Sequence, residues 1–208
     1  MTAKRVVLAT LAVLIVVGVA WAVAPWSLQG SAMAVKQGQP PNPWAIKLPS
    51  MLPDQPYSVV HFALPSGDMD FDDIAQLSAD FNVTDTFCGG GSPRFQIAID
   101  MNGDGEFKQP TDGNVFVYFG PFPNFTDCPL NSWQSTGNLI GATDLRFDTS
   151  QVGGTFYDSY ANALTLVGDK AVLGISLVVD SGWMGSQVVL VDNVAINNFQ
   201  LRAKGFSK

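Results

Sequence analysis

Catalytic motifs and their usual residues are scarce in this sequence. It has a single histidine, His61, and it contains no H-E-x-x-H, G-x-S-x-G, Walker or G-x-G-x-x-G motif. A Ser-His-Asp triad would have to use His61, which lies in the apolar stretch YSVVHFAL and is better explained as a structural residue. A glycosidase needs two carboxylates across a cleft, and no spacing singles out such a pair. The sequence therefore predicts no catalytic residues and a protein that is not an enzyme.

Charged residues are also few, at 14% against about 25% in typical domains. Of the 18 acidic residues only Glu106 is glutamate, and aspartate prefers helix caps and turns to helix interiors. With 20 glycines and 13 prolines, the composition favours strands and turns over helices. The net charge of −7 argues against nucleic acid, which needs a basic face, and is compatible with cation binding or with plain solubility.

One long apolar run, Val6–Ala24, follows Lys4 and Arg5, and this combination is an export signal. The run is close to the ~20 residues that span a bilayer. Cleavage after the A-x-A site at Ala32–Ala34 would make residues 1–34 a signal peptide, and retention would make the run a signal-anchor helix. Either outcome predicts an extracellular or envelope-exposed domain that meets the membrane only through this N-terminal segment.

A proline-rich segment follows at residues 35–56 and favours extended conformations typical of a semi-rigid spacer. Trp44 and Ile46 leave a second interpretation open, in which this segment docks on the domain as an edge segment. The predicted division is a leader at 1–34, a spacer at 35–56, a folded domain at 57–200 and a short basic tail at 201–208.

Cys88 and Cys128 are the two cysteines, and both lie in turn-like sequence. An even pair in an oxidising compartment most simply forms a disulfide. A zinc site would need more Cys and His ligands than the chain contains.

Short apolar runs alternate with turn signals from Tyr57 onward. In RFQIAID, Phe95, Ile97 and Ile99 fall on one face, which is the pattern of a half-buried strand. Further strands are expected at 57–63, 76–83, 115–120, 145–148, 164–167, 172–180 and 187–197, with a helical turn near 71–76. Many short strands without a long helical period predict an all-β fold, a two-sheet antiparallel sandwich of the jelly-roll type.

The strongest local motif is D-x-N-x-D-G-E, formed by Asp100, Asn102, Asp104 and Glu106 directly after a predicted strand. Alternating oxygen side chains with glycine at the sixth position resemble the opening half of an EF-hand or dockerin calcium loop. Position 12 is Thr111 in place of the bidentate glutamate, although Asp112 follows. The sequence predicts calcium here, and a metal-free Asn/Asp/Gly turn is the alternative.

A second calcium ligand is suggested by V-L-V-D-N-V, in which Asp192 ends an apolar strand. This pattern resembles the closing strand of jelly-roll carbohydrate-binding modules, and the resemblance implies that Asp192 ligates a structural calcium ion. A hydrogen bond to a neighbouring loop would also explain a buried aspartate. The order of CGGGSPRFQIAID, GDGE, VFVYFGP and TGNL is similar to that of a set of secreted microbial proteins, a likeness that implies no activity.

Aromatic residues supply the candidate ligand-binding surface. Sugars stack on aromatic faces, so Tyr118, Phe122, Phe125, Trp133 and Trp183 are candidate glycan contacts, with core packing as the alternative. The function predicted from the sequence is a calcium-stabilised, non-catalytic module that binds glycan or another envelope component. The alternative is a structural surface or pilus-like subunit that self-associates by strand addition through residues 35–56 or the C-terminal tail.

Overall fold

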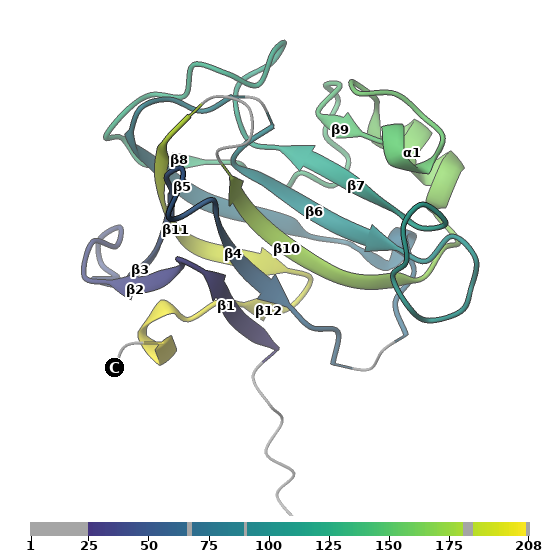
Figure 1. Ribbon diagram of the computed structural model, residues 1–208, viewed down its shortest axis with the longest axis horizontal. Helices are drawn as coiled ribbons and strands as arrows, with labels where there is room; N and C mark the ends of the chain where they lie inside the picture. The colour runs from purple at the N-terminus through teal and green to yellow at the C-terminus, as the bar shows by residue number, and fades with distance from the viewer. Residues whose placement is uncertain (1–24, 66–67, 90, 181–184, 207–208) are drawn as a thin grey trace, which may run out of the picture.

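Two antiparallel β-sheets packed face to face form the body of the protein in the computed structural model, which describes residues 25–65, 68–89, 91–180 and 185–206 (Figure 1). Sheet A contains, in spatial order, β1 (Trp26–Gly30), β4 (Tyr57–Phe62), β10 (Val172–Asp180), β6 (Arg94–Ile99), β7 (Gly113–Tyr118) and β9 (Phe147–Asp148). Sheet B contains β2 (Met33–Val35), β3 (Ala45–Ser50), β11 (Gln187–Ile196), β5 (Leu77–Asp85) and β8 (Gln134–Ser135), and β12 (Phe199–Gln200) pairs with the end of β11. These sheets confirm the predicted all-β sandwich.

The winding of eight of these strands is that of a jelly roll. Sheet B has the order β3-β11-β5-β8 and sheet A the order β4-β10-β6-β7, so most consecutive strands alternate between the sheets. The first strands of this set therefore lie beside the last ones. The remaining strands extend the sheets at their edges.

Side chains that alternate along the strands form the core between the sheets. In β6, Phe95, Ile97 and Ile99 are fully buried, while Arg94 and Gln96 lie on the outer face. The half-buried pattern predicted for RFQIAID is thus confirmed, and it leaves the polar residues of β6 facing outward.

The predicted N-terminal boundaries are wrong, because residues 26–50 belong to the sandwich. β1 pairs with β4 in sheet A, and β3 pairs with both β2 and β11 in sheet B. Ala45, Ile46 and Leu48 are fully buried, so the docked interpretation of this segment holds and the spacer does not. Proline was misleading here, since the extended backbone that it favours also suits a strand.

The export segment lies mostly outside the described residues, which begin at Pro25. Cleavage after Ala34 would remove β1 and two of the three residues of β2. None of the helices formed by the described residues is both long and apolar enough to cross a membrane.

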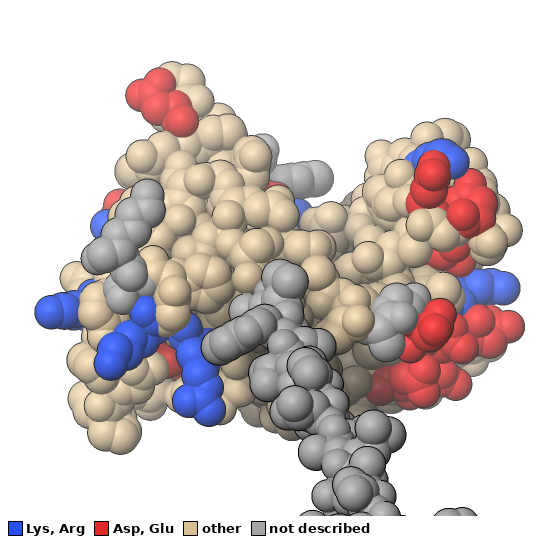
Figure 2. Space-filling model, turned by 90° about the horizontal axis from the view of Figure 1, so that it is seen from below, with Lys and Arg blue, Asp and Glu red and all other residues tan. Residues whose placement is uncertain are grey.

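The segment 201–206, predicted as a tail, is also part of the fold. Leu201 and Ala203 are buried, and the 3₁₀-helix η3 (Ala203–Phe206) packs against β2 and β3. The lysines and arginines at the left of Figure 2 lie on this side of the molecule.

Besides η3, the described residues form three more helical segments outside the sheets. The 3₁₀-helix η1 (Phe71–Asp73) confirms the expected helical turn, and a second, η2 (Ser150–Val152), follows β9. The strand predicted at 164–167 is wrong, because these residues end α1 (Tyr160–Val167). The Ser159 hydroxyl accepts a hydrogen bond from the Asn162 N–H at 3.1 Å and caps this helix, which buries Ala163 and Val167 one turn apart.

The predicted disulfide is present between Cys88 and Cys128, with 5.5 Å between the two Cα atoms. It joins the turn between β5 and β6 to the loop between β7 and β8. Disulfides persist in oxidising compartments, so this bond supports an extracytoplasmic location.

Candidate functional site

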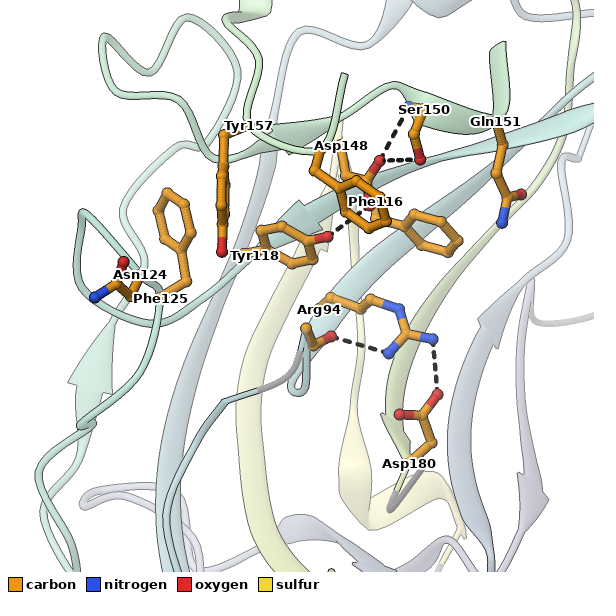
Figure 3. Close-up of a pocket in the computed structure, with 12 residues that line it drawn as sticks. Arg94, Phe116, Tyr118, Asn124, Phe125, Asp148, Ser150, Gln151, Tyr157 and Asp180 are labelled. Carbon is orange, nitrogen blue, oxygen red and sulfur yellow. Dashed lines mark hydrogen bonds and ion pairs between the residues drawn. The ribbon is translucent and has the colours of Figure 1, made fainter. Parts of the chain in front are cut away.

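A cavity of about 420 Å³ opens where the ends of four strands of sheet A meet three loops (Figure 3). Its walls come from β6, β7, β9 and β10 and from the segments that follow β7 and β9. The lining residues are Gly91, Arg94, Phe116, Tyr118, Asn124, Phe125, Asp148, Ser150, Gln151, Phe156, Tyr157 and Asp180.

Aromatic rings form one wall of this cavity. The rings of Tyr118, Phe125 and Tyr157 contact one another, with centroids 5.5 Å apart for Tyr118 and Phe125 and 5.8 Å for Phe125 and Tyr157. Tyr118 and Phe125 are buried, whereas Tyr157 is 50% exposed and its neighbour Phe156 is 61% exposed. Two buried rings therefore support an aromatic surface that is open to solvent.

An ion pair lies across the cavity from this wall. Arg94 on β6 contacts the Asp180 carboxylate on β10 at 2.7 Å and donates a second hydrogen bond to the Gly91 carbonyl at 2.9 Å. Its guanidinium also lies 5.0 Å from the centre of the Phe116 ring. These three contacts fix the plane of the guanidinium and compensate its charge.

The third group is a buried hydrogen-bond network around Asp148 on β9. The Tyr118 hydroxyl donates to this carboxylate at 2.6 Å, and the Ser150 hydroxyl donates at 2.6 Å. Burial, followed by the hydrogen bond to Asp148, raises the pKa of Tyr118 far above its ordinary value. Tyr118 therefore stays a neutral phenol that orients Asp148, and the network holds both side chains in place (Figure 3).

The predicted aromatic contacts divide into three groups. Tyr118 and Phe125 line the cavity, and the exposed ring of Phe122 lies 6.1 Å from that of Phe125. Trp133 is half-buried just before β8 of sheet B and does not line this cavity. Trp183 lies outside the described residues.

Five further lining residues were missed in the sequence. Arg94, Asp148 and Asp180 lie in or at the ends of strands, where sequence patterns predict only that they face outward. Phe156 and Tyr157 are adjacent aromatic residues directly after a Gly-Gly-Thr turn. Two neighbouring rings outside any strand pattern are the signal that would have revealed this wall.

The predicted calcium loop runs from Asp100 to Asp112 and is closed by its own hydrogen bonds. The Asp100 carboxylate accepts from the Gly103 and Gly105 N–H groups at 2.6 and 2.7 Å, and the Asp112 carboxylate accepts from the N–H groups of Met101 and Lys108. The donor chemistry fits calcium, since carboxylate and amide oxygens recur at alternate positions. The same hydrogen bonds are those of an Asn/Asp turn, so this geometry is compatible with both interpretations.

Two exposed residues of this loop pair with a lysine. The Lys108 amine contacts Glu106 at 2.7 Å and Asp104 at 3.2 Å. The Glu106 N–H, followed by the Asn102 amide, lowers the pKa of Asp104 below its ordinary value. Among the described residues, three carboxylates come within 4.8 Å of one another at the exposed residues Asp70, Asp72 and Asp73, and not in the Asp100–Asp112 loop.

Asp192 lies on β11 of sheet B, opposite Asp80 of β5, and its hydrogen bonds go to other residues than those of the Asp100–Asp112 loop. Both of its carboxylate oxygens accept from the Asn42 amide, at 2.9 and 3.1 Å, and one accepts from the Asn193 N–H. Burial raises the pKa of Asp192 above its ordinary value. The hydrogen bond to a neighbouring loop that was the alternative explanation of this aspartate is present, and calcium ligation by Asp192 stays a prediction.

Comparison with known proteins adds little to this geometry. No family model and no curated protein matches the chain. A solved structure described as a structural analysis of an exo-β-agarase aligns with 88% of the chain at 14% identity and a TM-score of 0.39. The aligned part is 24% of that longer chain, and a likeness this low supports no argument about activity.

Proposed function

We propose that this protein is an extracytoplasmic, non-catalytic binding module that recognises a glycan in the cavity of sheet A. The observation that supports this function is the pairing of the solvent-exposed rings of Phe156 and Tyr157 with fixed hydrogen-bonding groups across the same cavity. The apolar C–H face of a sugar can stack on these rings, and its hydroxyl groups can hydrogen-bond to the polar side chains of the cavity.

The polar groups suit recognition better than catalysis. A glycosidase needs one carboxylic acid that keeps its proton and a second carboxylate across the bond. In this cavity, Asp148 accepts hydrogen bonds from Tyr118 and Ser150, and Asp180 pairs with Arg94. Each carboxylate already has donors that orient it, and this arrangement provides fixed acceptors for sugar hydroxyls.

The test is to measure glycan binding after removing the exposed ring with Tyr157→Ala. A sugar that covers about 55 Å² of the ring gains roughly 1.4 kcal/mol, so we expect a tenfold loss of affinity on titration calorimetry with a ligand identified on a glycan array. Phe107→Ala is the matched control, because Phe107 is 40% exposed but lies on the Asp100–Asp112 loop outside the cavity.

Two results would contradict the proposal. The first is equal loss of affinity in both variants, and the second is hydrolysis of a polysaccharide panel by the wild-type chain. The structural-subunit alternative is less well supported, because residues 26–50 already pair within their own sandwich and would have to be released before they could join a neighbour.

Calcium at the Asp100–Asp112 loop stays a prediction, with Asp100, Asn102, Asp104, Glu106 and Asp112 as the oxygen donors. Bound calcium would offset two of the negative charges of the loop and rigidify it, without taking part in ligand recognition. Asp192 is left out of this proposed site, because it lies on β11 of sheet B, opposite Asp80 of β5, and shares no hydrogen-bond partner with the residues of the loop.

A further inference from the structure

Charge is distributed very unevenly along this chain. All 18 acidic residues lie between Asp54 and Asp192, together with only four of the 11 basic residues. This central stretch therefore has a formal charge of −14, while the residues on either side of it have +7. Such asymmetry within an acidic protein indicates a basic surface with its own partner.

The fold brings the two basic ends of the sequence together. Lys47 on β3 pairs in register with Met33 of β2, and Lys36 follows directly after β2. The helix η3, which contacts β2 and β3, contains Lys204 and follows Arg202. Figure 2 shows a group of positive residues at the left, on this side of the molecule, whereas most of the acidic residues in this view lie at the right, where they are mixed with some positive ones. We call Lys36, Lys47, Arg202 and Lys204 the basic surface.

Three cations of this surface, Lys36, Lys47 and Arg202, differ from four other described cations in their ion pairing. Arg94, Lys108, Arg146 and Lys170 all form ion pairs with aspartate or glutamate. Among the described residues, no ion pair involves Lys36, Lys47 or Arg202, and Lys36 instead lies over the Trp44 ring at 5.5 Å. The positive charges of Lys36, Lys47 and Arg202 are thus available to an anionic partner.

The basic surface lies where the apolar run joins the sandwich. Val6–Ala24 ends one residue before Pro25, whose carbonyl accepts a hydrogen bond from the Ala63 N–H at 2.7 Å. Pro25 and Trp26 share a surface cavity of about 500 Å³ with Arg202 and Phe206. No linker therefore separates the run from the residues next to the basic surface.

From these observations we propose that the basic surface lies against the anionic lipid headgroups of the membrane that holds the apolar run. The proposal rests on retention of Val6–Ala24 as a signal-anchor, and it adds a second membrane contact to the one predicted. Charge complementarity supports it, since each lysine or arginine near an anionic bilayer favours binding roughly fivefold. The sheet A cavity is formed by other elements, so this surface and the proposed glycan site are separate.

The experiment uses the full chain reconstituted in vesicles of phosphatidylcholine, with or without about one third phosphatidylglycerol. A fluorophore attached at Met33→Cys, a 45% exposed position on β2, reports contact through a quencher on the lipid headgroups. We expect quenching in the anionic vesicles alone and its relief at ~1 M salt, where the screening length is about 3 Å.

Charge reversal tests the residues themselves. In Lys36→Glu/Arg202→Glu the docked fraction should fall, with the ratio of docked to undocked domain reduced by more than about 25-fold, the factor expected for the loss of two positive charges alone. Lys108→Glu/Lys170→Glu makes the same change in net charge on other exposed lysines and should leave quenching unchanged. If the first variant does not fold, Lys36→Gln/Arg202→Gln supplies the same comparison.

Equal quenching in both lipid compositions, or equal effects of the two charge-reversed variants, would overturn the proposal. A chain that does not float with either kind of vesicle would overturn it together with the signal-anchor. Glycan binding is measured on the same preparations. If it persists while membrane docking fails, the membrane proposal is overturned and the proposed function is not.

Discussion

Replacing Trp26 with alanine tests whether the sandwich begins at β1. Trp26 is 9% exposed, and its ring lies 4.9 Å from that of Phe62 on β4, the strand with which β1 pairs over five residues. A tryptophan buries ~200 Å², which at about 25 cal/mol per Å² sets an upper bound near 5 kcal/mol. An edge strand relaxes more easily than a central one, so we expect Trp26→Ala to lower the free energy of unfolding by about 3 kcal/mol.

The assay is urea unfolding followed by circular dichroism, since this signal does not depend on the tryptophan removed. The melting temperature should fall by about 6–12 °C for a domain of this size. Leu52→Ala is the control, because Leu52 is 60% exposed and its removal should change stability by less than ~0.5 kcal/mol. An equally small change in Trp26→Ala would refute the assignment of β1 to the folded domain.

Three further predictions concern the disulfide, calcium and Asp192. Cys88→Ala/Cys128→Ala removes a disulfide between residues 40 positions apart. By the chain-entropy model this should lower the free energy of unfolding by about 4 kcal/mol, and a loss smaller than ~1 kcal/mol in urea unfolding would contradict it. Calcium should raise the melting temperature of the wild type and not of Asp100→Asn/Asp104→Asn, and no shift between calcium and chelator would remove the metal. Because burial raises the pKa of Asp192 in the folded state, the folded state binds this proton more readily than the unfolded one. The charged Asp192 therefore lowers the free energy of unfolding, and this penalty should diminish as the pH falls through the raised pKa toward the ordinary value near 4. Asp192→Asn should weaken this pH dependence in unfolding curves measured on both proteins. Equal pH dependence in the two proteins would contradict the prediction.

Local patterns in the sequence were enough to predict the sandwich. The alternation in RFQIAID predicted β6, and the long apolar stretches predicted β10 and β11. Both cysteines were predicted to pair, because an even number in an exported chain leaves few alternatives. Each of these inferences depends on neighbouring residues or on a count, which the sequence states directly.

The N-terminal strands could not be predicted in the same way. β3 is buried because β11, from the other end of the chain, pairs with it, and Ile46 lies opposite Val191. The prolines around it suggested a spacer, since no local pattern shows such a distant partner. For the short helix α1, by contrast, a local signal was present. Its apolar residues were interpreted as a strand because the helix cap at Ser159 was not recognised.

The candidate site was predicted in part. Tyr118 and Phe125 were chosen because aromatic residues cluster in VYFGPFPNF, and both line the cavity. Arg94, Asp148 and Asp180 come from three different strands, and only the order of strands in sheet A places their side chains around one space. The sequence thus predicted the aromatic character of the site but neither its charged residues nor its geometry.

The pairing of strands from the two ends of the chain also affects when the protein can complete its fold. β3 and β4 lie beside β11 and β10, so their places in the sheets stay incomplete until residues near Ile196 have been synthesised. Such long-range pairing slows folding, and the waiting strands are prone to aggregate. We therefore expect a nascent chain to complete its two sheets only late, after β10 and β11 have become available for pairing with β4 and β3.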